Sequence, residues 1–305
     1  MKVAVTGATG VIGTSAVRAL VAAGHDVVGM ARTPQKADVL HDLGATSART
    51  ASFEHEGLVE MLDGCDAVCN VATHIPVGFS AIRPGAWREN DRLRTEGVRR
   101  VVAAAREAGV RRFVQESVSC IYADHGDRWI TEESPLEINR ATEPASVGEF
   151  HLQAYRCGSR HGVVLRFGTI VSDDALTRRM LRSAKNRHPI GMGSPAGWAH
   201  VVHTDDLGLA VVAALNAPGG VYNVGAEPTV RADLVQGFAD AAGRDTGEFM
   251  GPFLRRVAGS RVEPLSRSLR VSSEHFTAQT GWTPRRSVFD ASWFDVPSTE
   301  SKALR

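Results

Sequence analysis

Residues 2–13 of this chain read Lys2-Val3-Ala4-Val5-Thr6-Gly7-Ala8-Thr9-Gly10-Val11-Ile12-Gly13. The apolar, β-branched beginning predicts a short buried strand. After the glycines, the helical spacing of Ala16, Leu20 and Val21 predicts a helix that stops near Gly24. Three glycines between a strand and a helix are typical of a turn that binds a dinucleotide, so this stretch indicates both a fold and a ligand.

Each glycine has a separate role in such a turn. Gly7 permits the tight turn, Gly10 lets the backbone approach a pyrophosphate, and Gly13 allows the helix to pack closely on the strand. The free N–H groups at the start of the helix would bind the phosphates. We therefore expect the pyrophosphate to be bound by Gly7, Thr9, Gly10, Val11, Ile12 and Gly13. The alternative is a glycine-rich turn without a ligand.

The end of the next strand, at residues 27–30, favours NADP over NAD as the cofactor. An acidic residue at this point would accept hydrogen bonds from the ribose 2′-hydroxyl of NAD. Here the strand continues into Ala31-Arg32-Thr33, and Lys36 follows one turn later. A guanidinium matches a 2′-phosphate in charge and in bidentate geometry. Arg32 and Lys36 are therefore the expected contacts of the 2′-phosphate, and the alternative is that both are solvated charges at a helix start.

Apolar strands alternate with amphipathic helices along most of the chain, which predicts an α/β protein with a parallel sheet covered on both faces. In the first part, helices are expected at residues 35–43, 58–62, 91–108 and 149–156, and strands at 67–71, 113–116 and 163–167. Further on, we expect a basic helix at 177–185, a strand at 200–203, a helix capped by Asp205 or Asp206 and running to 215, a strand at 221–224, and a helix capped by Thr229 and running to about 242.

The charge balance and the cysteines exclude several classes of protein. The 305 residues contain 35 Lys and Arg against 34 Asp and Glu, so no overall field would attract nucleic acid or an anionic membrane. The four cysteines have no CxxC spacing, which favours reduced thiols over disulfides or a zinc site. No apolar run is long enough to cross a bilayer, and Met1-Lys2 leads straight into a strand, so we expect a cytoplasmic protein without a signal peptide.

Several segments resemble, in family order, those of the extended and atypical short-chain dehydrogenases/reductases, which are NAD-dependent epimerase/dehydratase-like proteins. The resembling segments are TGxxGxxG at 6–13, the fourth strand and its end at 64–73, a helix and the fifth strand at 104–114, the approach to the catalytic tyrosine at 130–135, the "VHVDDLA" segment at 202–207, a late strand at 221–225, and the closing "GWxP" at 281–284. The resemblance covers nearly the whole chain.

This resemblance implies an enzyme with a Rossmann doubly wound parallel sheet and a small C-terminal substrate-binding domain. We expect residues 1–170 to form the NAD(P)-binding domain, with residues 200–226 returning to it, and residues 171–199 and 227–305 to form the substrate-binding region. The resemblance also implies that Ala72 and Thr73 lie along the cofactor and that Ser117 reaches the nicotinamide or the substrate. The expected partner is a small-molecule substrate, and a homodimer is left open.

The apparatus with which this family transfers protons is missing. Its usual members hold the substrate hydroxyl with a Ser or Thr, and pair a Tyr acid/base with a Lys four residues later. Counting back from Tyr122 places the Ser/Thr position at Val118, between Ser117 and Ser119. The Tyr–Lys pair would fall near Glu143 and Val147, and the asparagine of the long helix is replaced at its gap-free position by Arg94. No tyrosine in the chain is followed four residues later by lysine. Another group must therefore move the proton, or the reaction needs none.

Four side chains are the candidates for proton transfer: Ser119, Tyr122, His74 and Glu143. His74 follows the cofactor-side strand and has a suitable intrinsic pKa. Tyr122 could bond a substrate oxygen, and Glu143 could act as a base if it is buried. The alternatives are structural: Tyr122 as a packed aromatic ring, Glu143 as an exposed carboxylate, and Ser119 as a partner of backbone groups.

Two other polar clusters predict no site. His200, His203 and Asp205 offer metal-ligand types, but a strand and a capped helix account for them, so no metal is expected. The basic run at 178–187 is expected to be a solvated helix face, with contact to an anionic substrate as the alternative.

Three functions are compatible with these observations. The prediction is an NADP(H)-binding oxidoreductase or epimerase-like enzyme that acts on a small hydroxyl or carbonyl compound through a non-standard proton relay. The first alternative is a non-redox dehydratase, cyclase or isomerase whose nucleotide is structural or absent. The second is an NADP-sensing regulatory protein, which ranks last because no segment resembles a dedicated partner surface. The missing Tyr–Lys pair counts against the first function only.

Overall fold

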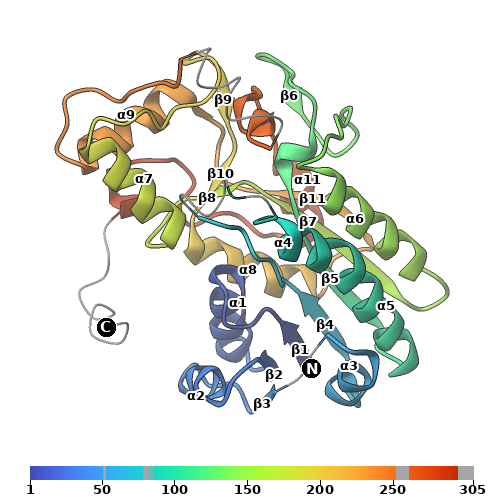
Figure 1. The fold of residues 1–305 in the computed structure, drawn as a ribbon. Helices are drawn as coiled ribbons and strands as arrows, with labels where there is room; N and C mark the ends of the chain where they lie inside the picture. The colour runs from blue at the N-terminus through green and yellow to red at the C-terminus, as the bar shows by residue number, and fades with distance from the viewer. Residues whose placement is uncertain (51–52, 78–82, 84, 252–260, 295–305) are drawn as a thin grey trace.

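A parallel sheet of seven strands forms the centre of the structure (Figure 1), a computed structural model that describes residues 1–50, 53–77, 83, 85–251 and 261–294. The strands are hydrogen-bonded in the order β3-β2-β1-β4-β5-β7-β11, each parallel to its neighbours. Their bounds are β1 (Lys2–Thr6), β2 (Asp26–Ala31), β3 (Ser47–Thr50), β4 (Ala67–Asn70), β5 (Arg112–Val118), β7 (His161–Phe167) and β11 (Gly220–Val224). This is the strand order of a Rossmann sheet, so the predicted fold class is confirmed.

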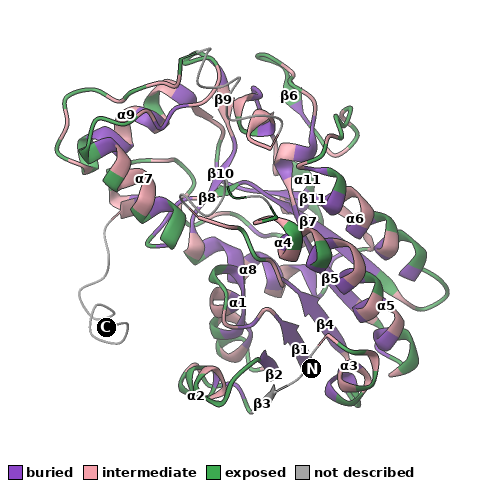
Figure 2. Ribbon diagram, in the orientation of Figure 1, coloured by how far each residue is buried: buried purple, intermediate pink, exposed green. Residues whose placement is uncertain are grey.

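Helices cover both faces of the sheet. One face carries α1 (Val11–Ala22), α2 (Pro34–Asp42) and α8 (Thr204–Ala214), and the other carries α3 (His55–Leu62), α5 (Val98–Glu107) and α6 (Glu143–Tyr155). Strand β1 shows how the sequence divides between them, because successive side chains of a strand point to opposite faces. Val3 and Val5 pack with α1 and α8, whereas Ala4 packs with α3 and α5. Strands β1, β4, β5 and β7 are accordingly drawn mainly in the colour of buried residues in Figure 2.

A smaller region lies beyond the carboxyl ends of β7 and β11 and has its own apolar core. Its elements are α7 (Ala175–Lys185), α9 (Arg231–Ala241), β8 (Thr169–Ile170), β9 (Trp198–Ala199), β10 (Val201–Val202), β12 (Thr229–Val230) and the 3₁₀ turn η5 (Ala291–Phe294). Phe238 and Trp293 are buried in this core. Adjacent residues connect the two cores, since Val201 packs in the small core and Val202 in the core beside α8.

The structure corrects three helix predictions. The helix predicted at 91–108 consists of α4 (Arg88–Arg92), a π-helical turn η2 (Leu93–Gly97) and α5. His203 caps α8 in place of Asp205 or Asp206, because its Nδ1 accepts the N–H of Asp205 at 3.2 Å. Helix α9 begins at Arg231, since Thr229 pairs with Ala199 between β12 and β9.

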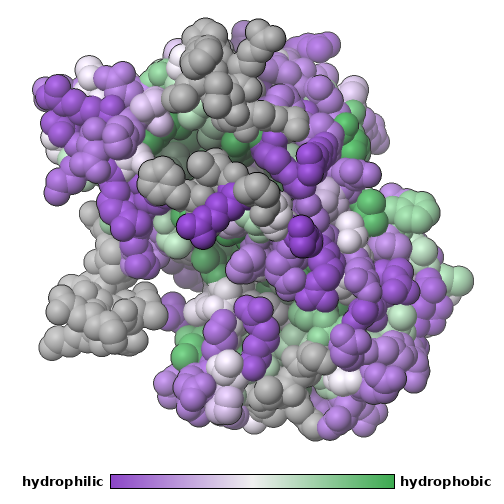
Figure 3. All heavy atoms as spheres, in the orientation of Figure 1, coloured by the Kyte–Doolittle hydropathy of each residue, from purple (hydrophilic) through white to green (hydrophobic). Residues whose placement is uncertain are grey.

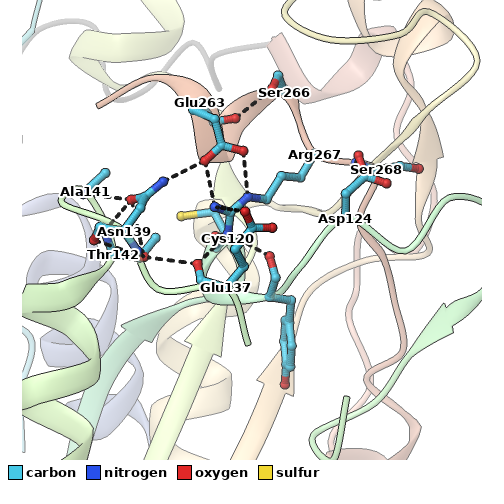
Figure 4. A network of polar contacts seen from close by, with 11 residues as sticks. Cys120, Asp124, Glu137, Asn139, Ala141, Thr142, Glu263, Ser266, Arg267 and Ser268 are labelled. Atoms are coloured by element: carbon cyan, nitrogen blue, oxygen red, sulfur yellow. Dashed lines mark hydrogen bonds and ion pairs between the residues drawn. The ribbon is translucent and has the colours of Figure 1, made fainter. Parts of the chain in front are cut away.

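A buried arginine anchors the segment that follows residue 260 (Figure 4). Arg267 donates from Nε and Nη2 to the Glu263 carboxylate at 3.0 and 2.6 Å, and from Nη1 to the carbonyl oxygens of Tyr122 and Glu137 at 2.9 and 2.8 Å. Glu263, at the start of the 3₁₀ turn η4 (Glu263–Ser266), also accepts from Asn139 Nδ2 at 2.6 Å. The network therefore holds the loop between β5 and α6 against the C-terminal segment.

Candidate functional site

The carboxyl ends of the parallel strands bring the predicted cofactor residues to one edge of the sheet. Gly7 follows β1, Arg32 follows β2, and the segment at 71–74 follows β4. Ser117 is the second-last residue of β5. The loops after β1 and β4 touch, because a Cβ atom at Gly7 would lie 2.6 Å from the Cα atom of Ala72. Open parallel sheets bind ligands at this edge.

The three glycines of the first turn differ in what surrounds them. Gly7 has a positive φ of 66°, which L side chains rarely adopt. A Cβ atom at Gly13 would lie 2.1 Å from the carbonyl oxygen of Gly7, so this glycine is needed for packing. At Gly10 a Cβ atom would approach only that same oxygen, at 3.2 Å. The N-cap residue of α1 is Gly10, which has no side chain to cap the helix. First-turn N–H groups are therefore available to phosphate oxygens. The turn thus fits a pyrophosphate.

Basic side chains lie beyond the end of β2. Arg32 is exposed, and Lys36 is half-buried in the first turn of α2, whose N-terminus is capped by Thr33. Glu89 on α4 faces the same edge. The hydrogen bond from Arg92 lowers the pKa of Glu89 most, and the charges of His74 and Arg32 lower it further. Arg32 and His74 therefore lie near one acidic group.

A ladder of buried polar side chains crosses three strands just below this edge. Thr6 Oγ1 donates to Asn70 Oδ1, and Asn70 Nδ2 donates to Gln115 Oε1 at 2.8 Å. Gln115 Nε2 then donates to the carbonyl oxygen of Glu116 at 2.7 Å. The residues are register partners on β1, β4 and β5, and each is at most 4% exposed. The ladder connects the ends of three strands beneath the site. In the sequence, the only indication of it is that polar residues stand at the ends of these apolar strands.

A second buried network fixes the hydroxyl groups of Ser117 and Tyr122. Ser117 Oγ donates to Glu149 Oε1 at 2.5 Å, and Arg166 donates to both oxygens of that carboxylate at 2.9 and 2.6 Å. Arg166 Nη1 donates to the Tyr122 hydroxyl at 2.8 Å, and this hydroxyl donates to Asn223 Oδ1 at 2.8 Å. Burial raises the pKa of Tyr122 to about 12. Tyr122, although a predicted proton donor, lies within a continuous buried network.

Helix α6 carries the segment to which the missing Tyr–Lys pair was assigned. Glu149 faces Ser117, so the residue four positions earlier on the same helical face, Ala145, also faces β5. Ala145 is 5% exposed, whereas Glu143 is exposed and Val147 is half-buried. The assignment of the pair to positions near Glu143 and Val147 stays a prediction. Glu143 is not brought together with the other candidates, and its role as a base stays a prediction.

Ser119 and His74 are the two remaining candidates for proton transfer. Ser119 is buried in the 3₁₀ turn η3 (Ser119–Ile121), which follows β5 directly. His74 is exposed, and its backbone N–H donates to the buried Asn90 Oδ1 at 3.3 Å. His74 borders an open hollow of about 500 Å³. On the face in Figure 3, apolar residues are visible in a recess between the region of α7 and α9 and the rest of the molecule.

Arg94 and Glu116 form a buried ion pair that the sequence did not predict. Arg94 lies in the π-helical turn η2, and its Nη2 donates to Glu116 Oε1 at 2.6 Å. Both side chains are nearly inaccessible. The carbonyl oxygen of Arg94 would lie 2.8 Å from a Cβ atom at Gly148, so η2 packs directly against α6. The irregular turn thus brings a cation beside the end of β5.

The two histidines considered as metal ligands have different surroundings. His200 is 3% exposed and, among the described residues, neither of its ring nitrogens has a hydrogen-bond partner. Burial lowers the pKa of His200 to about 3. His203 caps α8 and lies 3.2 Å from the Asp205 carboxylate. Within the part of the chain that the structure describes, no three His, Cys, Asp or Glu side chains are grouped as a metal site would require, and no helix is long and apolar enough to cross a membrane.

Comparison with known proteins identifies a family and several similar proteins. The model of the NAD dependent epimerase/dehydratase family matches residues 3–225. A Streptomyces protein described as 3-diazoavenalumate denitrifying reductase is 28% identical over 301 residues, which are 93% of this chain and 96% of that protein. The structure of human epimerase family protein SDR39U1 with NADPH has a TM-score of 0.79 at 22% identity, over 96% of this chain and 98% of that one. MoeE5 in complex with UDP-glucuronic acid and NAD has a TM-score of 0.72 at 22% identity, over 93% and 94% of the two chains.

Proposed function

The chain belongs to the NAD-dependent epimerase/dehydratase family, and from this premise we propose that it is an NADP(H)-dependent reductase of a small molecule. The observation that carries the proposal is the pairing of an open glycine turn with a basic strand end. Gly10 leaves room for a pyrophosphate at the start of α1, and Arg32 is exposed where an acid would favour NAD. The Streptomyces relative, which matches over almost its whole length, is named a reductase.

The preference for NADP(H) rests on charge at the end of β2. A 2′-phosphate placed there would meet the guanidinium of Arg32 and the ammonium of Lys36. The N-terminus of α2, with Lys36 in its first turn, adds a favourable dipole. The similar human protein was solved with NADPH and MoeE5 with NAD, so the choice between the two cofactors is proposed here from the residues after β2.

The chain's own residues would bind and orient this cofactor. Gly7, Gly10 and the first turn of α1 would hold the pyrophosphate. Ala72 and Thr73 would border the dinucleotide, and Ser117 would lie near its nicotinamide end. When bound, the reduced cofactor supplies a hydride.

Isothermal titration calorimetry with NADPH and NADH tests this proposal. We expect NADPH to bind more tightly than NADH. Arg32→Ala should weaken the binding of NADPH by about 1.5–3 kcal/mol and leave the binding of NADH almost unchanged, because the variant removes a charge-assisted partner of the 2′-phosphate. Lys185→Ala, which removes an exposed cation on α7, is the control for a general loss of positive charge. Equal affinities for the two cofactors would mean that Arg32 does not contact the cofactor.

A further inference from the structure

We propose that the substrate is an aromatic diazonium compound, which takes a hydride and releases N₂ without taking up a proton. This inference rests on the proposed reductase function and specifies its substrate class. Three grounds support it. The hydroxyl groups of Ser117 and Tyr122 donate their hydrogens within the protein, Val118 and Ala145 are apolar, and the reduction of a diazonium ion needs no acid.

Two hydroxyl groups near the end of β5 have their hydrogens engaged elsewhere. Ser117 donates to Glu149, whose carboxylate also accepts two hydrogen bonds from Arg166. Tyr122 donates to Asn223 and accepts from Arg166. Each hydroxyl therefore offers at most a lone pair to a ligand. Releasing the Tyr122 hydrogen to a substrate would leave the buried Asn223 Oδ1 without this donor, and releasing the Ser117 hydrogen would remove one of three donors from the buried Glu149 carboxylate.

Apolar side chains occupy the positions where the family has its catalytic groups. Val118, at the end of β5, takes the place of the Ser or Thr that holds a substrate hydroxyl. Ala145 is buried on the face of α6 that points to β5, one turn before Glu149. A methyl group there can neither lower the pKa of a phenol nor donate a proton. Val118 and Ala145 therefore supply no proton donor at this edge, which leaves Ser119 and His74 as the remaining candidates.

The stoichiometry of reduction separates the two classes of acceptor. A carbonyl compound takes a hydride at carbon and a proton at oxygen, so it needs an acid. An aromatic diazonium ion takes only the hydride: its C–N bond breaks, a C–H bond forms, and N₂ leaves. The two electrons come from the reduced nicotinamide, and the positive charge of the diazonium ion passes to the oxidised cofactor. Atoms and charge balance without an external proton.

A relative independently points to the same acceptor. The Streptomyces protein that matches 93% of this chain is described as a denitrifying reductase of a diazo compound. Its description contains the two elements of the inference, reduction and loss of nitrogen.

The test uses the full-length protein with NADPH and 4-carboxybenzenediazonium labelled with ¹⁵N. We expect one N₂ per NADPH oxidised, at a rate at least about tenfold above the reaction without protein. We also expect no net proton uptake in weakly buffered solution and a rate independent of pH between about pH 6 and 8, the range in which an unperturbed imidazole titrates. The Gly10→Val variant controls for spontaneous reaction of the diazonium ion with the cofactor in the presence of protein.

Three outcomes would overturn the inference. Turnover of the matched aldehyde, 4-carboxybenzaldehyde, but not of the diazonium ion would refute it and leave the proposed reductase function intact. Net proton uptake during turnover would show that the reduction needs an acid, and it would refute the inference. Failure of NADPH to bind in calorimetry would refute the proposed function itself.

A measurement without turnover tests the structural premise. Proton NMR of the protein without cofactor should show slowly exchanging hydroxyl resonances that disappear in Ser117→Ala and Tyr122→Phe. Rapid exchange of both hydroxyl hydrogens would mean that they are available to a substrate, and the inference would fail.

Discussion

At Gly10 a side chain would meet one protein atom, whereas at Gly13 it would overlap the backbone of the same turn. The two glycines of one motif therefore serve different purposes. Gly13 is required for the packing of α1 on β1. Gly10 is required for the approach of the proposed pyrophosphate to the backbone of the turn. The distinction gives a test of where the cofactor binds.

We predict that Gly10→Val abolishes nucleotide binding and leaves the protein folded. The added methyl groups would occupy the space through which the backbone meets the pyrophosphate, and the single close contact, with the Gly7 oxygen, requires only a small shift. Calorimetry and circular dichroism check the two parts. Gly13→Val is the comparison, and it should lower stability itself. Normal nucleotide affinity in Gly10→Val would show that the cofactor lies elsewhere.

For Tyr122→Phe we predict a loss of about 1–3 kcal/mol in the free energy of unfolding, with nucleotide affinity unchanged. The variant leaves Arg166 Nη1 and Asn223 Oδ1 without their buried partner. Urea unfolding measures the loss. If stability is unchanged but turnover falls by about a hundredfold, Tyr122 is a proton donor after all.

The positions of several candidate site residues at the carboxyl edge of the sheet could be predicted from the sequence, because they depend on the order of the strands. The glycine turn, Arg32 and the contact partner Ala72 follow from motif and strand order. The ion pairs Arg94–Glu116 and Glu149–Arg166 were not predicted, because they join charges distant in sequence through the packing of α5 and α6 on the sheet. No local pattern distinguishes such a pair from solvated charges.

Among the elements, strands with unbroken apolar runs were predicted closely, whereas α6 begins six residues before the predicted residue 149. Strands β1, β4, β7 and β11 lie within about two residues of the expected ranges, since their apolar runs are unbroken. Strands of two residues, such as β8 and β10, have no periodicity to detect. The π-helical turn η2 was not predicted because α4, η2 and α5 share one amphipathic pattern. The close packing of the Arg94 backbone against Gly148 of α6 is seen only in the structure.

At the scale of elements, we predict that Arg267→Met destabilises the protein by about 3 kcal/mol or more. The variant removes the donors of the Tyr122 and Glu137 carbonyl oxygens and leaves the Glu263 carboxylate without its cation. Thermal or urea unfolding measures the effect, and Arg111→Met, at an exposed position, is the control. A loss similar to that of the control would show that η4 does not depend on this network.

For the whole molecule, we predict that stability falls as the pH is lowered below about 6.5, before the carboxylates titrate. Burial lowers the pKa of His200 to about 3, and burial also lowers the pKa of His203. Below about pH 6.5 the unfolded chain binds protons at these imidazoles and the folded protein does not, so protonation favours unfolding. For His200 alone the loss of stability is about 1.4 kcal/mol per pH unit between about pH 6.5 and pH 3.

Urea unfolding at about pH 7 and pH 5 measures this loss of stability, and His200→Gln should make stability less dependent on pH. An NMR titration in which the His200 ring protonates near pH 6.5 without unfolding would contradict the prediction, because the folded protein would then bind the proton as readily as the unfolded chain.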